Sequence, residues 1–296
     1  MSTPDILCIG SVLWDVIGRT ASHMKPGADV PGRITRIPGG VAMNIAMTLG
    51  RFDLFPALLS AVGQDPEGHE LIGECQRRHL NTDHIYRSAD LPTDIYMAIE
   101  AANGLIAAIA DAHSLEAAGD KILTPLMDGT LGSDAAPFAG IIALDGNLTT
   151  ALLQQIAVEP CFARADLRIA PASPGKADRL LPFIRATRGT LYVNLEEAGL
   201  LCQTTFASAA EAAAGLVDRG AARALVTNGG DSCADAIQGS VLAETPPKVL
   251  VTRVTGAGDS FMAAHIAAEH RGADRPSALT QALAAAAAYV SGEVAI

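Results

Sequence analysis

The sequence predicts a doubly wound α/β fold, in which helices flank a mainly parallel sheet and a small β-sheet forms a lid. Short apolar runs typical of buried strands alternate with helical patterns, and the alternation is regular from about residue 139. Two earlier regions, near 12–37 and 94–110, break that alternation and indicate an antiparallel insertion. With 296 residues, 49% of them hydrophobic, the chain is long enough to bury a substantial core, and we expect a single domain over 1–296.

The first half of the chain predicts both sheets. A buried strand is expected at Ile6–Ile9, and Ala57–Val62 is expected to form the next one. Helices are predicted from Gly39-Gly40 through Phe52, and after the Gly63–Gly68 loop through His79. Lid strands are predicted at 12–19, 33–37, 95–101 and 105–110, the last two joined by the hairpin turn Ala102-Asn103-Gly104. The same segments would alternatively form edge strands of the main sheet.

The second half predicts the rest of the parallel sheet. Short apolar strands are expected at 140–144, 167–170, 190–193 and 224–226, with helices between them. The stretch Ala282–Ala288 is almost pure alanine, which a helix packed closely against a neighbour explains without any special function.

Bulk properties exclude several classes of protein. A net charge of −11 argues against a nucleic-acid or membrane-surface binder, although not against a phosphorylated substrate. The chain has no apolar run of about 18 residues and no basic signal-peptide start, so we expect a cytoplasmic protein without a membrane span. Its five cysteines form no CxxC pair, and free thiols in a reducing compartment are expected.

The run Val254–Phe261 is the most informative motif. Gly256, Ala257 and Gly258 are three small residues where a helix begins, so backbone N–H groups and the positive end of the helix dipole are accessible to an anion. Asp259 places a carboxylate at the edge of that site, which suits proton abstraction from a hydroxyl beside a phosphoryl group. The plainer interpretation is a glycine turn capped by an aspartate.

Two further groups of residues suit a sugar. Gly39 and Gly40 permit close backbone approach or a positive φ, and Asn44 offers a donor and an acceptor one turn into the helix. A carboxylate at Asp15 would accept hydrogen bonds from two adjacent hydroxyls. The alternatives are an ordinary strand–turn–helix connection and an exposed turn aspartate.

Polar residues also follow later strands, where ligands gather in open parallel sheets. Asp145 and Asn147 come after one apolar run and are candidates for the substrate site. Asn194 and Glu197 come after another; the carboxylate suits Mg²⁺ held through water, and a capping-box variant explains the same pair. Thr227, with Gly229 after it, either cradles a nucleotide phosphate or makes an ordinary turn.

Taken together, these pieces resemble the ribokinase-like PfkB carbohydrate kinases. Five motifs occur in the family's order across nearly the whole chain: Gly39-Gly40 with Asn44, Gly63-x-Asp65-x-x-Gly68, Asn194-x-x-Glu197, Thr227-x-Gly229 and Gly256-Ala257-Gly258-Asp259. Within the family the chain is most similar to the pseudouridine kinases, through Gly32-Arg33-Ile34, Asp145-x-Asn147 and Pro171-x-Ser173-x-x-Lys176.

The resemblance implies an ATP- and Mg²⁺-dependent transfer to the 5′ hydroxyl of a ribosyl nucleoside. Asp259 would be the base, and the amides of Gly256, Ala257 and Gly258 would stabilise the developing charge. The remaining roles are implied as follows: the sugar held by Asp15, Gly39, Gly40 and Asn44; the nucleotide by Asn194, Thr227, Gly229, Gly256 and Gly258; the metal by Glu197 and Asn194. A homodimer through the lid is the family expectation, with a nucleoside or sugar substrate and no nucleic-acid polymer or membrane partner.

Several positions depart from the family's pattern. Arg253 stands where the family usually has Asp or Asn, which makes a nearby monovalent-cation site doubtful. The other departures are Leu13, Asp53, Ala170 and Ser232, and they leave the sugar pocket open to differences. The alternatives are therefore a kinase of a free sugar or sugar acid, and a non-catalytic binding protein that kept the fold.

Overall fold

The computed structural model describes residues 4–293, and a large mixed sheet forms its centre. The strand order is β14-β13-β12-β11-β10-β9-β1-β4, parallel from β4 to β12 and antiparallel at β13 and β14. The strands are β1 (Ile6–Ile9), β4 (Ala57–Leu59), β9 (Ile141–Asp145), β10 (Asp166–Ala170), β11 (Thr190–Asn194), β12 (Arg223–Thr227), β13 (Cys233–Ile237) and β14 (Ser240–Glu244).

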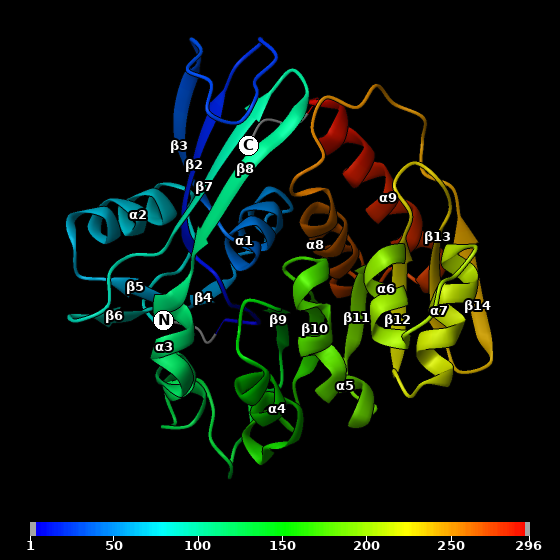
Figure 1. Cartoon of the computed structure of the whole chain (residues 1–296). Helices are drawn as coiled ribbons and strands as arrows, with labels where there is room; N and C mark the ends of the chain where they lie inside the picture. Colours follow the sequence, from blue (N-terminus) through cyan, green and yellow to red (C-terminus); the bar gives the residue numbers. More distant parts are fainter. Residues whose placement is uncertain (1–3, 294–296) are drawn as a thin grey trace.

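Helices cover both faces of this sheet (Figure 1). One face packs against α1 (Val41–Arg51), α2 (Pro66–Arg77), α8 (Ala257–His270) and α9 (Arg275–Ser291). The other packs against α3 (His113–Ala118), α4 (Thr150–Val158), α5 (Leu181–Arg185), α6 (Leu195–Cys202) and α7 (Ala209–Asp218). Short 3₁₀ helices span Gly119–Leu126, Pro160–Phe162 and Pro174–Leu180. The apolar runs of the parallel strands are buried on both sides, so the predicted doubly wound architecture is confirmed.

The lid is a separate four-stranded sheet that projects from the main body (Figure 1). Its order is β3-β2-β7-β8, formed by β2 (Leu13–Arg19), β3 (Arg33–Gly39), β7 (Ile95–Ala101) and β8 (Gly104–Asp111). The β2–β3 and β7–β8 pairs are antiparallel, whereas β2 and β7 run parallel. The predicted insertion therefore forms its own sheet, and the alternative of edge strands in the main sheet is wrong. The expectation that this sheet is antiparallel throughout is also wrong, because its two central strands run parallel.

Two predictions about strands need correction. The expected single strand Ala57–Val62 is two strands, because the chain leaves the main sheet at Ser60, and β5 (Ala61–Gly63) pairs instead with β6 (Tyr86–Ser88). The regular parallel pattern expected from residue 139 also ends early, since β13 and β14 form an antiparallel hairpin at the sheet edge. Across residues 4–293, no helix is both long and apolar enough to span a membrane.

Candidate functional site

The site is built around the start of α8. Gly256 precedes the helix with φ 86°, and a side chain there would place its Cβ 2.5 Å from the Tyr289 hydroxyl, so only glycine suits this position. The first helical bond runs from Ser260 N to Gly256 O at 3.0 Å. The amides of Gly258 and Asp259 lie ahead of that bond and, with the helix dipole, offer donors to an anion. The Ala257 amide, predicted as a third donor, instead donates to Val254 O at 3.0 Å within the loop.

The Asp259 carboxylate lies beside these donors in the first turn of α8 and is partly buried. Asn44 Nδ2 in α1 donates to Asp259 Oδ2 at 2.9 Å, joining residues that are 215 positions apart. Burial raises the pKa of Asp259 to about 7; the carboxylates of Asp145, Asp15 and Glu197 act in the same direction, and the Asn44 bond opposes them. A carboxyl group with a pKa near neutrality suits a general base.

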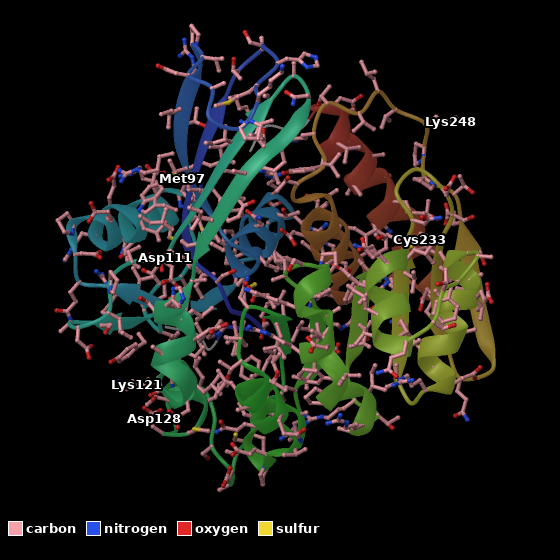
Figure 2. The ribbon with its side chains drawn as sticks, in the orientation of Figure 1. Met97, Asp111, Lys121, Asp128, Cys233 and Lys248 are labelled. Carbon is pink, nitrogen blue, oxygen red and sulfur yellow. The ribbon has the colours of Figure 1, made fainter. Side chains whose placement is uncertain are left out.

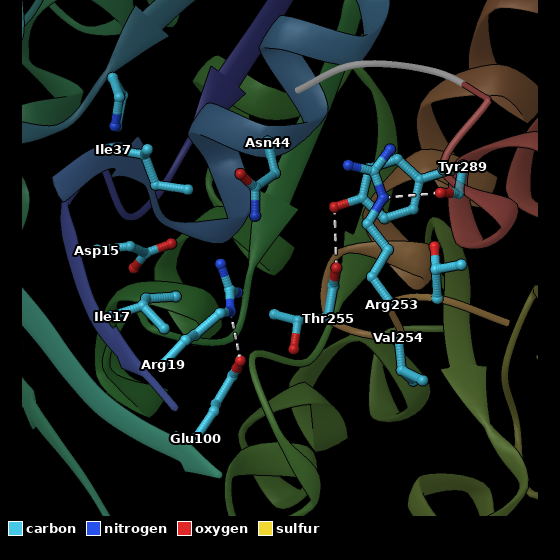
Figure 3. Close-up of a pocket in the computed structure, with 13 residues that line it drawn as sticks. Asp15, Ile17, Arg19, Ile37, Asn44, Glu100, Arg253, Val254, Thr255 and Tyr289 are labelled. Atoms are coloured by element: carbon cyan, nitrogen blue, oxygen red, sulfur yellow. Dashed lines mark hydrogen bonds and ion pairs between the residues drawn. The ribbon is translucent and has the colours of Figure 1, made fainter. Parts of the chain in front are cut away.

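A cavity of about 560 Å³ lies between the lid and the loop that leads into α8 (Figure 3). Asp15 faces it from β2, and burial raises the pKa of this carboxyl group to about 6. Asn44 enters from α1, so two residues predicted for the sugar meet in one cavity, next to Asp259. The cavity is lined by Asp15, Ile17, Arg19, Ile37, Pro38, Asn44, Glu100, Thr252, Arg253, Val254, Thr255, Tyr289 and Gly292.

The glycine pair before α1 lets the lid and the main body approach closely. A Cβ on Gly39 would overlap the Asp15 carboxylate, and one on Gly40 would overlap the Ser11 carbonyl oxygen. Gly40 also has φ 95°, which side chains rarely adopt. Both glycines therefore fix the position of Asp15 and of the α1 start.

Asp145 and Asn147 belong to a hydrogen-bonded cluster around Ser11. Asp145 is fully buried, and its Oδ2 accepts from Ser11 N at 2.7 Å, Ser11 Oγ at 2.8 Å and Ala42 N at 3.1 Å. Asn147 donates to Ser11 Oγ at 2.9 Å and accepts from Lys176 Nζ at 2.7 Å. Neither residue lines the 560 Å³ cavity, so the structure does not bring them into the cavity as the sequence predicted.

A second cavity, of about 350 Å³, is lined by Asp259 itself. Asn194 and Glu197 line it and also form a capping box, with Glu197 N donating to Asn194 Oδ1 at 2.9 Å and Asn194 N to Glu197 Oε2 at 2.8 Å. Glu197 is 6% exposed, and burial raises its pKa. Both interpretations of this pair are compatible with the geometry. Thr227 and Gly229 line the same cavity.

An apolar cavity of about 460 Å³ adjoins Thr227 and Gly229, and the sequence did not reveal it. Small side chains of α9, including Ala286 and Ala287, form one wall, and the loop after β14 forms another; Figure 2 shows Lys248 on that loop. The alanine run interpreted as plain packing therefore also leaves space for a ligand. The available signal was Pro246-Pro247, which marks an irregular segment between the last strand and the Val254–Phe261 motif.

Arg253 is tied to α9. Its Nε donates to Tyr289 O at 2.7 Å, and the guanidinium lies 3.8 Å from the centre of the Tyr289 ring (Figure 3). The Tyr289 hydroxyl in turn donates to Thr255 O at 2.9 Å, which fixes the loop before Gly256. The prediction that Arg253 makes a nearby monovalent-cation site doubtful stays a prediction.

The Gly63-x-Asp65-x-x-Gly68 motif lies away from the cavities and anchors the lid. Asp65 caps α2 by accepting from Gly68 N at 2.8 Å, and accepts from Thr93 N at 2.7 Å. The next residue, Asp94, accepts from Ser114 N and Leu115 N at 3.0 Å each. These bonds hold the chain where β7 begins.

Fold and site together define a class: an α/β protein whose helix start offers amides to an anion, next to a carboxylate under a β-sheet lid. A family model described as pfkB family carbohydrate kinase matches residues 3–296, and the chain belongs to that family.

The chain is similar in sequence or structure to three proteins described as kinases. The chain is 32% identical to the uncharacterized sugar kinase YeiI of Escherichia coli over 50% of its own length, which spans only 40% of that protein. It is 27% identical to the pseudouridine kinase of Escherichia coli, covering 87% of this chain and 81% of that one. The structure of Arabidopsis thaliana ribokinase complexed with ribose and ATP superimposes with a TM-score of 0.78 at 20% identity, covering 99% and 95% of the two chains, and supports the fold.

Proposed function

We propose that this protein is an ATP-dependent kinase that phosphorylates the 5′ hydroxyl of a ribosyl nucleoside, with pseudouridine the first candidate. The observation that carries the proposal is the position of Asp259, which lines the 350 Å³ cavity, accepts a hydrogen bond from Asn44 of the 560 Å³ cavity, and lies beside the bare amides at the α8 start. The pseudouridine kinase relative supports the choice of substrate.

In the proposed reaction, Asp259 accepts the proton of the nucleoside hydroxyl as its oxygen attacks the γ-phosphorus of ATP. The new O–P bond forms as the bond between the γ-phosphorus and the bridging oxygen breaks, and ADP leaves. The amides of Gly258 and Asp259 stabilise the charge on the transferred group. Asp15 and Asn44 hold the sugar hydroxyls, and Gly39 and Gly40 keep Asp15 in place.

The nucleotide is proposed to occupy the other two cavities. The apolar cavity suits a flat base, and Thr227 and Gly229 connect it to the α8 start. The donor set fits Mg²⁺ in its usual kinase form, in which one protein carboxylate acts together with phosphates and waters. Glu197 supplies that carboxylate, with Asn194 beside it, and the metal would neutralise phosphate charge.

The test is transfer from ATP. Purified protein with ATP, Mg²⁺ and pseudouridine should give the 5′-monophosphate and ADP in equal amounts, measured by mass spectrometry. A panel of nucleosides and pentoses extends the search. Absence of transfer to every member of the panel contradicts the proposal, and so does hydrolysis of ATP without a phosphorylated acceptor.

The second candidate is phosphorylation of a free sugar or sugar acid, which a mouse ribokinase 24% identical over 88% of this chain favours. Competition separates the two: excess pseudouridine should suppress any transfer to ribose, because both would occupy the cavity beside Asp15. A non-catalytic relative is the third reading, and the placement of Asp259 beside the helix amides argues against it.

We also propose that the lid forms a homodimer in a reducing cytoplasm, where the free cysteines would persist. Ile34, Met97 and Ile109 lie on the lid face opposite Asp15, with 76%, 48% and 68% exposure; Figure 2 labels Met97. Such an apolar patch favours a protein contact. Light scattering should give twice the chain mass, and Ile109→Lys should lower it to a single chain; a wild-type monomer contradicts the proposal.

A further inference from the structure

One polar feature of the 560 Å³ cavity has no part in holding a sugar near Asp259. Arg19 Nε donates to Glu100 Oε2 at 2.7 Å, and both side chains line the cavity (Figure 3). They lie opposite each other on the paired strands β2 and β7. A donor group and an acceptor group are thereby presented side by side within the cavity.

The length of the cavity can be estimated along strand β2 of the lid. Asp15, Ile17 and Arg19 alternate along β2 and share the face that lines the cavity. At about 3.3 Å per residue, Arg19 lies about 13 Å along the strand from Asp15. A free pentose held by Asp15 next to Asp259 ends well short of Arg19. A ligand that also reaches Arg19 carries a second group beyond its sugar.

The surface between these two ends is apolar. Ile17 lies between Asp15 and Arg19, and Ile37, which pairs with Asp15 across the β2–β3 ladder, lines the same cavity. Aliphatic side chains suit the face of a flat ring, and the cavity volume of about 560 Å³ falls in the range of about 300–1,000 Å³ typical of sites for ligands larger than a simple sugar.

The charges of Arg19 and Glu100 limit which kind of ligand group can bind beside them. Arg19 alone would suit a carboxylate or a phosphate, but Glu100 beside it cancels the charge and would repel an anion. A neutral edge that carries one N–H donor next to one C=O acceptor satisfies both residues at once. The edge of a uracil ring has this pattern, whereas a sugar acid does not.

We infer that Arg19 and Glu100 are specificity-determining residues that read the edge of a uracil-type base. Glu100 accepts from a ring N–H, and Arg19 donates to the adjacent carbonyl. The inference rests on the proposed function in so far as the nucleoside is the acceptor, and it names the part of that acceptor which the lid recognises.

The matched variants are Glu100→Met and Glu70→Met. Glu70 lies on α2, outside the cavity lining, and pairs with Arg36 of β3, so the control loses an equivalent lid ion pair. The Arg19 and Glu100 side chains are 56% and 34% exposed, and exposed ion pairs add little to stability, so both variants should fold. Unchanged melting temperatures and unchanged ATP affinity verify this.

The experiment measures binding first and turnover second. Isothermal titration gives the Kd of pseudouridine and of its N1-methyl and N3-methyl forms for each protein, and kcat/KM is measured with the same ligands. Methylation at the nitrogen read by Glu100 should weaken binding to the wild type and to Glu70→Met about 10- to 100-fold, as expected for a hydrogen bond to a charged group. Glu100→Met should bind unmodified pseudouridine about as weakly as the wild type binds the methylated form. Methylation should then weaken binding to Glu100→Met by less than about threefold more.

Three outcomes overturn the inference: the same methylation penalties in Glu100→Met and in the wild type, no penalty in the wild type at either nitrogen, or no nucleoside binding. Binding with the predicted pattern but without transfer contradicts the kinase proposal and leaves the base recognition standing. Phosphoryl transfer together with an unchanged methylation penalty in Glu100→Met contradicts the base recognition and leaves the kinase proposal standing.

Discussion

Replacing Asp259 by Asn should remove turnover while leaving both ligands bound. The asparagine keeps the shape and the contact with Asn44 but accepts no proton, so kcat should fall about 10²- to 10⁴-fold. KM for pseudouridine and for ATP should change less than about threefold, because the binding groups stay in place. A parallel rise in both KM values would show that Asp259 binds a ligand instead of acting as the base.

The pKa of Asp259 also determines how kcat/KM should depend on pH. With its pKa raised to about 7 by burial, Asp259 is protonated and inactive below neutrality, so kcat/KM should rise with pH and level off above about 7. The residual activity of Asp259→Asn should lack this limb. A wild-type profile that is flat between pH 5 and 8 would refute the assignment.

The pH dependence of folding stability gives a second, independent test of the Asp259 pKa. A folded pKa of about 7 against 3.8 means that the folded state binds the proton more tightly, so stability is lost as pH rises from about 4 to 7. The change in proton affinity, at about 1.4 kcal/mol per tenfold, corresponds to about 4 kcal/mol, and solvent in the open cavity reduces it. Asp259→Asn should therefore melt several degrees above the wild type at pH 8.

The control for both measurements is Asp83→Asn, an exposed turn aspartate that lies outside the cavities. Its melting temperature and kinetics should match the wild type at every pH. Thermal melts of the three proteins at pH 5 and pH 8 suffice. If the Asp259→Asn advantage does not grow between pH 5 and pH 8, the electrostatic reasoning is wrong.

Three further substitutions probe other parts of the site. Gly39→Ala forces a Cβ into the Asp15 carboxylate and should raise KM for the nucleoside at least about tenfold without changing KM for ATP, whereas Gly50→Ala, which has open space, should be silent. Ala286→Leu narrows the apolar cavity and should raise KM for ATP about tenfold, with the exposed Ala284→Leu on the same helix as control. Tyr192→Phe removes a buried hydroxyl bonded to His265 Nδ1 at 2.8 Å and should lower the unfolding free energy by about 1–3 kcal/mol in a denaturant titration; equal stability would contradict it.

Much of the fold was predictable because apolar runs report burial directly. The parallel strands were found from continuous apolar runs, because both of their faces are buried. The lid strands were found because they break the regular alternation of strands and helices. Strand β13 was missed because Cys233–Ile237 contains few strong strand formers and a central Asp235. That aspartate is fully buried, and it is tolerated because Arg223 and Arg275, distant in sequence, pair with it.

The site was predictable where a residue's type already limits its geometry. Gly256 at positive φ and Asp259 in the first helical turn match the helix start expected from the spacing of the α8 motif, whereas the roles assigned to these residues stay predictions. The role of Asp145 could not, because its carboxylate turns toward Ser11 and not toward the cavity. The apolar cavity was equally hidden, since its walls come from a loop and a helix that only tertiary packing brings together.

In the proposed reaction, a site with acidic side chains around Asp259 would have to hold a triphosphate. The described residues that line the 350 Å³ cavity include no Lys or Arg, and they place Glu197 beside Asp259. Anion binding there must depend on backbone amides and the α8 dipole, which stay in place when the ligand leaves. Burial raises the pKa of Asp259, and the neighbouring carboxylates add to that rise, so the acidity that makes the site unfavourable for a bare phosphate also helps to make Asp259 a stronger base. Binding of nucleotide should therefore depend steeply on a divalent cation, and omitting Mg²⁺ should weaken ATP binding in titrations of Asp259→Asn as well as of the wild type.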